Sequence, residues 1–354
     1  MSFSLGIVGL PNVGKSTLFS ALTKKQAEVQ NFAFTTIDPN VGVVNVPDER
    51  LDKLVEICNP KSVVPTTIEF VDIAGLVKGA NKGEGLGNQF LANIREVDAI
   101  VQVVRLFSDS GITHVYETVD PSRDIEIINT ELILADVETL EKHHKKIEGK
   151  AKSGDKLFMH ELEITNNLLH HLRQGGLAKD FKYNKEDASF INNLWLLTSK
   201  PIMYVANVSE EQLKAEVDLK ILPADSIAIC AKLENDLLAL ADEEVAEYLQ
   251  EAGIKQTGLD TLIQAGYKLL NLATFLTAGP DEVRAWTITN GSTAPQAAGR
   301  IHTDFEEKFI KAEVIDYKDY VEAGSELKAK DNGKMHLEGK EYIVKDGDVI
   351  YFII

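Results

Sequence analysis

Short apolar runs rich in β-branched residues alternate with helical patterns along the first part of the chain. Apolar residues recur at helical spacing over Ser16–Leu22 and Gln89–Val97, between these runs. The runs predicted as buried strands are Leu5–Val8, Ile68–Val71, Ile100–Val104, Ile202–Val205 and Ile227–Cys230. Alternation of this kind is typical of βαβ units, and it predicts an α/β fold with a mainly parallel sheet.

The alternation is interrupted between residues 127 and 200. Apolar residues at helical spacing over Ile127–Gly149 and again over Leu157–Leu172 predict two long helices, and Gly149–Asp155 between them predicts a turn. Two helices joined in this way form an antiparallel hairpin, which we expect to project from the sheet domain as an arm. The alternative is two ordinary surface helices packed on the sheet.

A third region begins near Ala278-Gly279-Pro280 and has short β-type runs separated by turn signals such as Asn290-Gly291. One helix is expected around Pro295–Ile301. The expected strands are Ala285–Ile288, Lys311–Ile315, Tyr342–Val344 and Val349–Ile354. The predicted domains are therefore 1–126 with 201–277 for the sheet domain, 127–200 for the arm and 278–354 for a C-terminal β-rich domain.

Composition limits the classes of partner. The chain has 354 residues and a formal net charge of −18, which disfavours contact with bare phosphate backbones, so we expect no DNA binding. Its two cysteines, Cys58 and Cys230, are too few for a disulfide framework and favour a reducing cytoplasm. No apolar run is long enough to span a bilayer, and we expect neither a membrane partner nor a signal peptide.

The segment from Gly9 to Ser16 matches the pattern G-x₄-G-K-S/T between a predicted strand and a predicted helix. In that context backbone N–H groups surround a phosphate chain, and the helix N-terminus adds positive potential. We expect Lys15 to reach the β- and γ-phosphates and the Ser16 hydroxyl to ligate Mg²⁺. The pattern predicts a P-loop nucleoside triphosphatase.

Two further segments have the order expected of nucleotide switches. Asp72 and Gly75 follow a predicted strand, where an aspartate can hold a Mg²⁺-bound water and a glycine N–H can meet a γ-phosphate. Thr36 lies earlier, in a polar loop, and is a candidate for the second hydroxyl on Mg²⁺. Loops of this kind become ordered around the γ-phosphate and relax after hydrolysis.

The base-recognition segment departs from that of GTPases, which carry N-K-x-D after a later strand. Val208 stands where the lysine is expected, and Glu210 replaces the aspartate with a chain one methylene longer, which misplaces the carboxylate for guanine. The Asn207 amide can face adenine N6 and N7. The segment therefore predicts that ATP is preferred over GTP.

Longer motifs make a specific resemblance. The second switch looks like that of the Obg-related GTPases, and together with the other motifs the chain resembles the YchF-type Obg-like ATPases along essentially its whole length. The motifs are Gly75–Ala80, Gly83–Asn88, Asn207–Glu210, Arg284–Thr287 and Ile301–Asp304. The resemblance implies an interrupted P-loop domain, a helical arm, a C-terminal TGS domain with a β-grasp fold, ATP preference and ribosome binding.

The resemblance also implies site residues. Phe107, Asn207 and Val208 would line the base, and Ala231 lies in a segment similar to the S-A-K turn that contacts the base. The residues implied to hold the phosphates are Asn12, Val13, Gly14, Lys15, Ser16 and Thr17. Asn12 is similar to the P-loop asparagine of K⁺-stimulated relatives, which makes K⁺ a candidate second cation beside Mg²⁺.

The water-positioning group is not the usual one. Leu76 occupies the position at which Ras-like switches carry a glutamine, and it can neither donate nor accept a hydrogen bond. We expect slow intrinsic turnover and a substitute from a mobile segment or a partner. His114, in the polar loop after Ile100–Val104, is the candidate, because a neutral histidine can orient or deprotonate water near pH 7. The resemblance implies the same residue, and the alternative is a solvated loop histidine.

Two functions from different classes remain open at this point. The first is a Mg²⁺-dependent ATPase acting as a ribosome-binding molecular switch in the cytoplasm. The second is a nucleotide-gated binding module that holds ATP as a ligand with little turnover. Phosphate release with and without ribosomes separates them.

Overall fold

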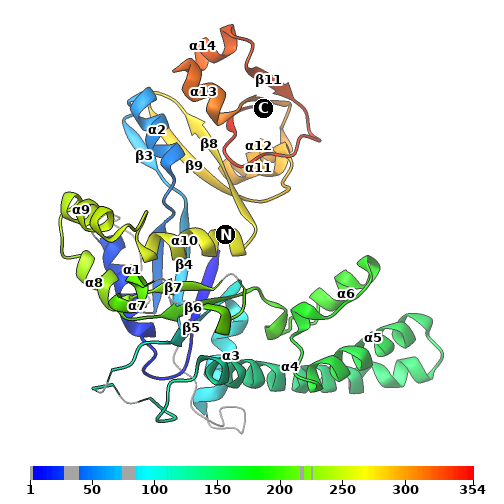
Figure 1. The fold of residues 1–354 in the computed structure, drawn as a ribbon. Coiled ribbons are helices and arrows are strands. Elements are labelled where there is room, and N and C mark those ends of the chain that lie inside the picture. Colours follow the sequence, from blue (N-terminus) through cyan, green and yellow to red (C-terminus); the bar gives the residue numbers. More distant parts are fainter. Residues whose placement is uncertain are drawn as a thin grey trace. The chain divides into compact units, whose positions relative to one another are not determined.

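The computed structural model describes most of the chain (Figure 1). The described residues are 3–27, 40–73, 85–109, 111–112, 114–215, 219–224 and 226–354. They group into two compact units, residues 3–42 with 69–259 and residues 43–68 with 260–354, here called the first and second units. Within the described part of the chain, no helix is long and apolar enough to cross a membrane.

A sheet in the order β2-β4-β1-β5-β6-β7 organises the first unit. The strands from β4 to β7 in this order pair in parallel, and β5 and β6 are buried at every position. Burial on both faces explains why they appear in the sequence as largely apolar runs. The strands are β1 (Ser4–Val8), β2 (Val41–Asn45), β4 (Thr67–Asp72), β5 (Ala99–Arg105), β6 (Ile202–Asn207) and β7 (Ile227–Ile229).

Helices follow these strands as βαβ units require, which confirms the predicted α/β fold class. The one that matters most for the site, α1 (Lys15–Ala27), begins directly after the loop that leaves β1. The others are α3 (Gly85–Glu96), α7 (Glu210–Lys214), α8 (Ala231–Leu237) and α9 (Asp242–Ala252), whereas most of α10 (Gly258–Leu269) belongs to the second unit.

The predicted helical hairpin is present. Helix α4 (Pro121–Lys152) begins with Asp120 as N-cap and a proline in its first turn, and α5 (Lys156–Arg173) begins after the N-cap Asp155. Figure 1 shows the two helices side by side and antiparallel, with their far ends extending away from the sheet. The chain returns through the short helix α6 (Ala188–Asn192).

The return segment is fixed to the arm by one buried carboxylate. Asp136 of α4 accepts hydrogen bonds from the Leu197 N–H (2.7 Å), the Thr198 N–H (2.8 Å) and the Thr198 hydroxyl (2.7 Å). It is only 1% exposed. Three donors satisfy this carboxylate, so it can remain buried and hold the middle of α4 against the segment that leads into β6.

The second unit contains a mixed sheet in the order β11-β10-β12-β8-β9-β3. Strands β8 and β12 run parallel beside each other, and β9 and β10 flank them antiparallel, which is the β-grasp arrangement. The strands are β3 (Ser62–Val64), β8 (Leu272–Ala278), β9 (Glu282–Thr289), β10 (Lys311–Ile315), β11 (Met335–Glu338) and β12 (Val349–Ile353).

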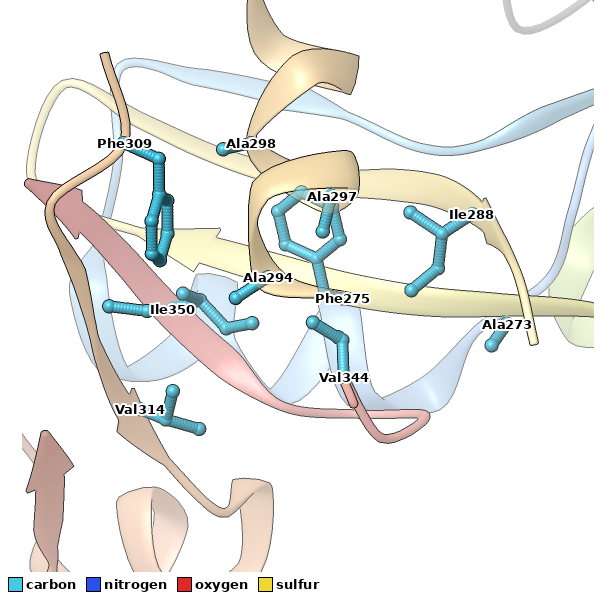
Figure 2. Close-up of a cluster of buried hydrophobic side chains, with 11 residues drawn as sticks. Ala273, Phe275, Ile288, Ala294, Ala297, Ala298, Phe309, Val314, Val344 and Ile350 are labelled. Carbon is cyan, nitrogen blue, oxygen red and sulfur yellow. The ribbon is translucent and has the colours of Figure 1, made fainter. Parts of the chain in front are cut away.

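Helix α11 (Ala294–Ile301) covers one face of this sheet (Figure 2). Its small residues Ala294, Ala297 and Ala298 pack on Phe275 and Ile288 of the strands, which lets the helix lie close to the sheet. Helices α12 (Thr303–Glu307), α13 (Tyr317–Ala323) and α14 (Glu326–Asp331) complete the C-terminal stretch. The expected strand Tyr342–Val344 was wrong, because only Ile343 makes a single bridge, to Thr293.

A segment from early in the sequence belongs to the second unit. Helix α2 (Glu49–Cys58) packs Leu51 and Leu54 into a core that also contains Val283 of β9, and β3 pairs in parallel with β9. The Arg50 guanidinium binds Asp346 at 2.7 Å. Between β2 and β4 the chain thus leaves the first sheet and adds a helix and a strand to the second unit. The domain limits expected from the sequence stay a prediction.

Candidate functional site

The phosphate-binding segment forms the predicted turn between β1 and α1. The Lys15 ammonium is buried and donates to the Leu10 carbonyl at 2.8 Å. Burial lowers the pKa of Lys15, and the nearby Asp72 carboxylate opposes that shift. Gly14 has φ +98°, and a Cβ placed there would lie 2.1 Å from the Asn207 side-chain nitrogen. Only glycine meets both requirements at this position.

A cavity of about 740 Å³ opens beside this loop, which is within the usual range for small-molecule sites. It is lined by three groups of residues: Asn12, Gly14, Lys15, Ser16 and Thr17 from the loop and α1; Phe107, Ser108, Asp109 and Ile112 after β5; and Asn207–Glu211 with Cys230–Leu233 and Asp236. The structure brings together every expected ATP-binding residue except Val13, which is buried behind the loop.

Asn207 ties these groups together. Its side-chain nitrogen donates to the Val13 carbonyl (2.9 Å), and its side-chain oxygen accepts from the Ala231 N–H (3.1 Å). The Leu106 and Phe107 N–H groups donate to its carbonyl at 2.9 and 3.3 Å. The side-chain oxygen and one amide proton are thereby used within the protein, so Asn207 has one side-chain N–H left for a base. Asn207 therefore also holds the walls of the cavity together, a structural role that the sequence analysis did not predict.

Glu210 lines the cavity, and one oxygen of its carboxylate is engaged by neighbouring side chains. Its carboxylate accepts from the Lys214 ammonium (2.7 Å) and the Tyr248 hydroxyl (3.1 Å). The hydrogen bond from Lys214 lowers the pKa of Glu210, and the bond from Tyr248 acts in the same direction. Val208 lines the cavity with an apolar side chain at the position where GTPases carry lysine.

Arg105 is a functional candidate that the sequence analysis missed. It ends β5 with a guanidinium that is buried and donates to the backbone carbonyls of Phe107 (3.1 Å), Ile112 (3.1 Å) and Asp109 (3.3 Å). The same group lies 4.3 Å from the Phe107 ring centroid. All three of these partners line the cavity, so Arg105 shapes one wall. A charged residue at the end of a mostly apolar strand was the available signal.

Oxygen donors suited to Mg²⁺ lie at the loop. The Ser16 side chain is exposed at the start of α1 and lines the cavity, and Asp72 ends β4 half-buried. Burial raises the pKa of Asp72, and the Lys15 ammonium opposes that shift. A hydroxyl and a carboxylate are donors that Mg²⁺ prefers. The switch candidates Thr36, Gly75 and Leu76 lie outside the described residues.

His114 is buried. It is not one of the described residues that line the cavity. Its Nε2 atom lies 2.9 Å from an Asp124 carboxylate oxygen, and its Nδ1 atom accepts from the Tyr116 N–H at 3.2 Å. This placement differs from the alternative of a solvated loop histidine. Asp124, in the first turn of α4, was not singled out from the sequence.

Family models match both ends of the chain. A model described as a 50S ribosome-binding GTPase matches residues 4–137. A model for the C-terminal region of YchF GTPases, described as a protein of unknown function, matches residues 272–354. The two matches fall on the P-loop region and on the β-grasp stretch.

Full-length relatives extend the likeness. The ribosome-binding ATPase YchF of Bacillus subtilis is 53% identical over 362 residues, covering 99% of this chain and 99% of the relative. The protein of the same name from Escherichia coli O157:H7 is 52% identical over 365 residues, covering 100% and 99%. The solved structure of the Schizosaccharomyces pombe YchF GTPase superposes with a TM-score of 0.90 at 39% identity and covers 99% of this chain and 98% of that one.

Proposed function

The chain belongs to the YchF family, and from that premise we propose that it hydrolyses ATP to ADP and phosphate as a nucleotide-controlled switch on the ribosome. Hydrolysis of a nucleotide by a P-loop domain follows from the family. The Bacillus and Escherichia relatives are named as ribosome-binding ATPases. The observation that carries the proposal is the single cavity that joins the P-loop, Asn207–Glu210 and Cys230–Leu233.

The phosphates bind at the loop and the start of α1. The Lys15 ammonium leaves the Leu10 carbonyl and meets the β- and γ-phosphates, while the N–H groups of Val13–Thr17 surround them. Ser16 and Thr36 are the residues that would hold Mg²⁺, with Asp72 on one of its waters, and the ion would neutralise phosphate charge when bound. Asn12, at the cavity edge, is the proposed contact for K⁺.

The base is adenine rather than guanine. The relatives are named both ATPase and GTPase, so the argument rests on the residues of the site. Guanine needs a carboxylate for N1–H and N2–H, and the Glu210 carboxylate is engaged by Lys214 and Tyr248. A guanine left without that partner loses affinity by about 10²-fold. Phe107, Val208 and Ala231 supply the apolar walls and the Asn207 amide one donor.

Hydrolysis uses His114 in place of the missing glutamine at Leu76. A neutral imidazole can orient the attacking water or accept its proton. In the structure both ring nitrogens of His114 are bonded within the protein, so the residue must move before it can act. Slow turnover by the isolated protein, accelerated by a partner, is the expected behaviour.

The partner is the ribosome, met in the cytoplasm through the arm and the C-terminal domain. We keep the sequence-derived limits for this proposal: 1–126 with 201–277 for the nucleotide domain, 127–200 for the arm and 278–354 for the TGS domain. The second candidate, a nucleotide-gated binding module with little turnover, is favoured by the buried position of His114.

Phosphate release from Mg²⁺–ATP tests the proposal. The wild-type protein should release phosphate slowly alone and faster with ribosomes. Lys15→Ala should release none in either case while keeping its melting temperature, because the lysine is a point charge on the phosphates. ATP binding without any release, even with ribosomes, would favour the binding module. Full release by Lys15→Ala would refute the assigned site.

A further inference from the structure

His114 lies in a closed hydrogen-bonded network at the foot of the arm. Its Nδ1 atom accepts from the Tyr116 N–H, so the ring proton of the neutral imidazole is on Nε2 and is donated to Asp124. The side chains of His114 and Asp124 are 2% and 3% exposed. A carboxylate that accepts this bond away from water fixes both the tautomer and the orientation of the ring.

The network extends to the next residues of α4. The second Asp124 oxygen accepts from Arg123 Nε (3.2 Å) and Nη2 (3.0 Å). The Arg123 guanidinium also donates to the Thr118 carbonyl at 2.7 Å and lies 4.9 Å from the Tyr116 ring centroid. Residues 114–118 are therefore held to the first turn of α4 by both neighbouring side chains.

We propose that Asp124 is a positioning residue that holds His114 in reserve, out of the nucleotide cavity, until the network opens. The proposal rests on the proposed catalytic role of His114. While Asp124 holds Nε2 and the Tyr116 N–H holds Nδ1, neither nitrogen can bind a water at the γ-phosphate. The fraction of molecules in which this pair is broken then limits intrinsic turnover.

The position of Asp124 gives the arm a means of control. Asp124 belongs to the first turn of α4, and the rest of α4 forms the arm. A partner that displaces α4 relative to the loop would separate the carboxylate from the imidazole. The histidine would then be free to enter the cavity, which joins partner binding to the chemical step without a residue supplied by the partner.

The decisive variant is Asp124→Asn, which keeps the shape and removes the charge. A charge-assisted hydrogen bond is about twice as strong as a neutral one, so intrinsic kcat for ATP should rise about three- to tenfold. The KM for ATP should not change, because neither Asp124 nor His114 is among the described residues that line the cavity. Stimulation by ribosomes should shrink by the same factor. Glu126→Gln, an exposed position on the same helix, is the matched charge control and should change nothing.

Combination with His114→Ala separates the possible failures. The gain of Asp124→Asn should disappear in the double variant. If Asp124→Asn leaves kcat unchanged or lowers it while His114→Ala abolishes ribosome-stimulated turnover, the reserve role is wrong and the catalytic role stands. If His114→Ala keeps full turnover in both backgrounds, the catalytic role and this proposal both fail. Asp124→Ser replaces Asp124→Asn if the latter does not fold, with the same outcomes.

Discussion

At Gly14 the phosphate loop has no room for a side chain. A methyl group there would lie 2.1 Å from the Asn207 side chain, in a backbone conformation with φ +98°. We expect Gly14→Ala to lower ATP affinity by roughly 100-fold, because strain and displacement of Asn207 act together. Isothermal titration calorimetry measures the change.

Gly149 offers the matched control for that substitution. It lies inside α4, and an added Cβ would meet nothing within 4 Å. Gly149→Ala should leave ATP affinity unchanged and stabilise the protein by about 0.5–1 kcal/mol, as expected for glycine in a helix. Equal losses of ATP affinity in both variants would contradict the account of the loop.

Base preference is also decided by single residues. The double change Val208→Lys with Glu210→Asp restores the GTPase pattern and shortens the carboxylate that Lys214 and Tyr248 now hold. The ratio of ATP to GTP affinity should fall by about tenfold or more in a competition titration. An unchanged ratio would mean that the base is read elsewhere in the cavity.

Arg105 supports the wall of the cavity that is formed by the residues after β5. In Arg105→Met three backbone carbonyls lose their donor, so the wall that carries Phe107 loosens. ADP affinity should fall about tenfold, the equivalent of roughly one lost hydrogen bond to a charged group. The affinity of Arg105→Met for pyrophosphate should equal that of the wild-type protein, since the phosphate loop keeps its contacts. Arg173→Met, at an exposed arginine paired with Glu141, is the control. Equal losses for both ligands would argue against a wall-specific role.

At the scale of the element, the arm depends on how the middle of α4 is fixed to the return segment. Asp136→Ala leaves three buried donors of Leu197 and Thr198 unsatisfied, so the free energy of unfolding should fall by about 3 kcal/mol. Glu138→Ala, two residues along, removes only an exposed pair with Lys142 and should cost less than about 0.5 kcal/mol. Denaturant unfolding compares them, and similar values would mean that Asp136 is not the fixing point.

Predictability from sequence differed between elements for physical reasons. Strands β5 and β6 are buried on both faces, so their apolar runs could be recognised from neighbouring residues alone. The P-loop pattern between β1 and α1 is also a continuous stretch of sequence and could be predicted in the same way. Strand β3 could not be predicted in this way, because its three residues, two exposed and one half-buried, form a strand only by pairing with β9 far along the chain. The β-type run at Tyr342–Val344 had the opposite outcome, because it was predicted as a strand and makes one bridge only.

The site shows the same division. The predicted ATP-binding residues that line the cavity follow from motifs, since the loops after parallel strands converge at one edge of a sheet. The bond between His114 and Asp124, and the use of Asn207 as a brace, join segments that are distant or unremarkable in sequence. Such contacts depend on tertiary packing, so they cannot be predicted from composition or from the spacing of residues in the sequence.

At the scale of the whole molecule, residues 43–68 limit how partner binding can be tested. Deleting 278–354 would remove most of the buried cluster around Leu51 and Leu54 and the strand beside β3. Loss of ribosome binding in such a truncated chain would therefore be confused with loss of folding. The intact chain in two nucleotide states avoids this problem.

Affinity for ribosomes in those two states tests the switch most directly. Cosedimentation should show binding at least about fivefold tighter with a non-hydrolysable ATP analogue than with ADP, because nucleotide switches in general order their switch loops around a γ-phosphate and relax after hydrolysis. Lys15→Ala, which cannot hold the phosphates, should bind equally in both conditions. Equal affinity of the wild-type protein for ribosomes with the analogue and with ADP would contradict the account.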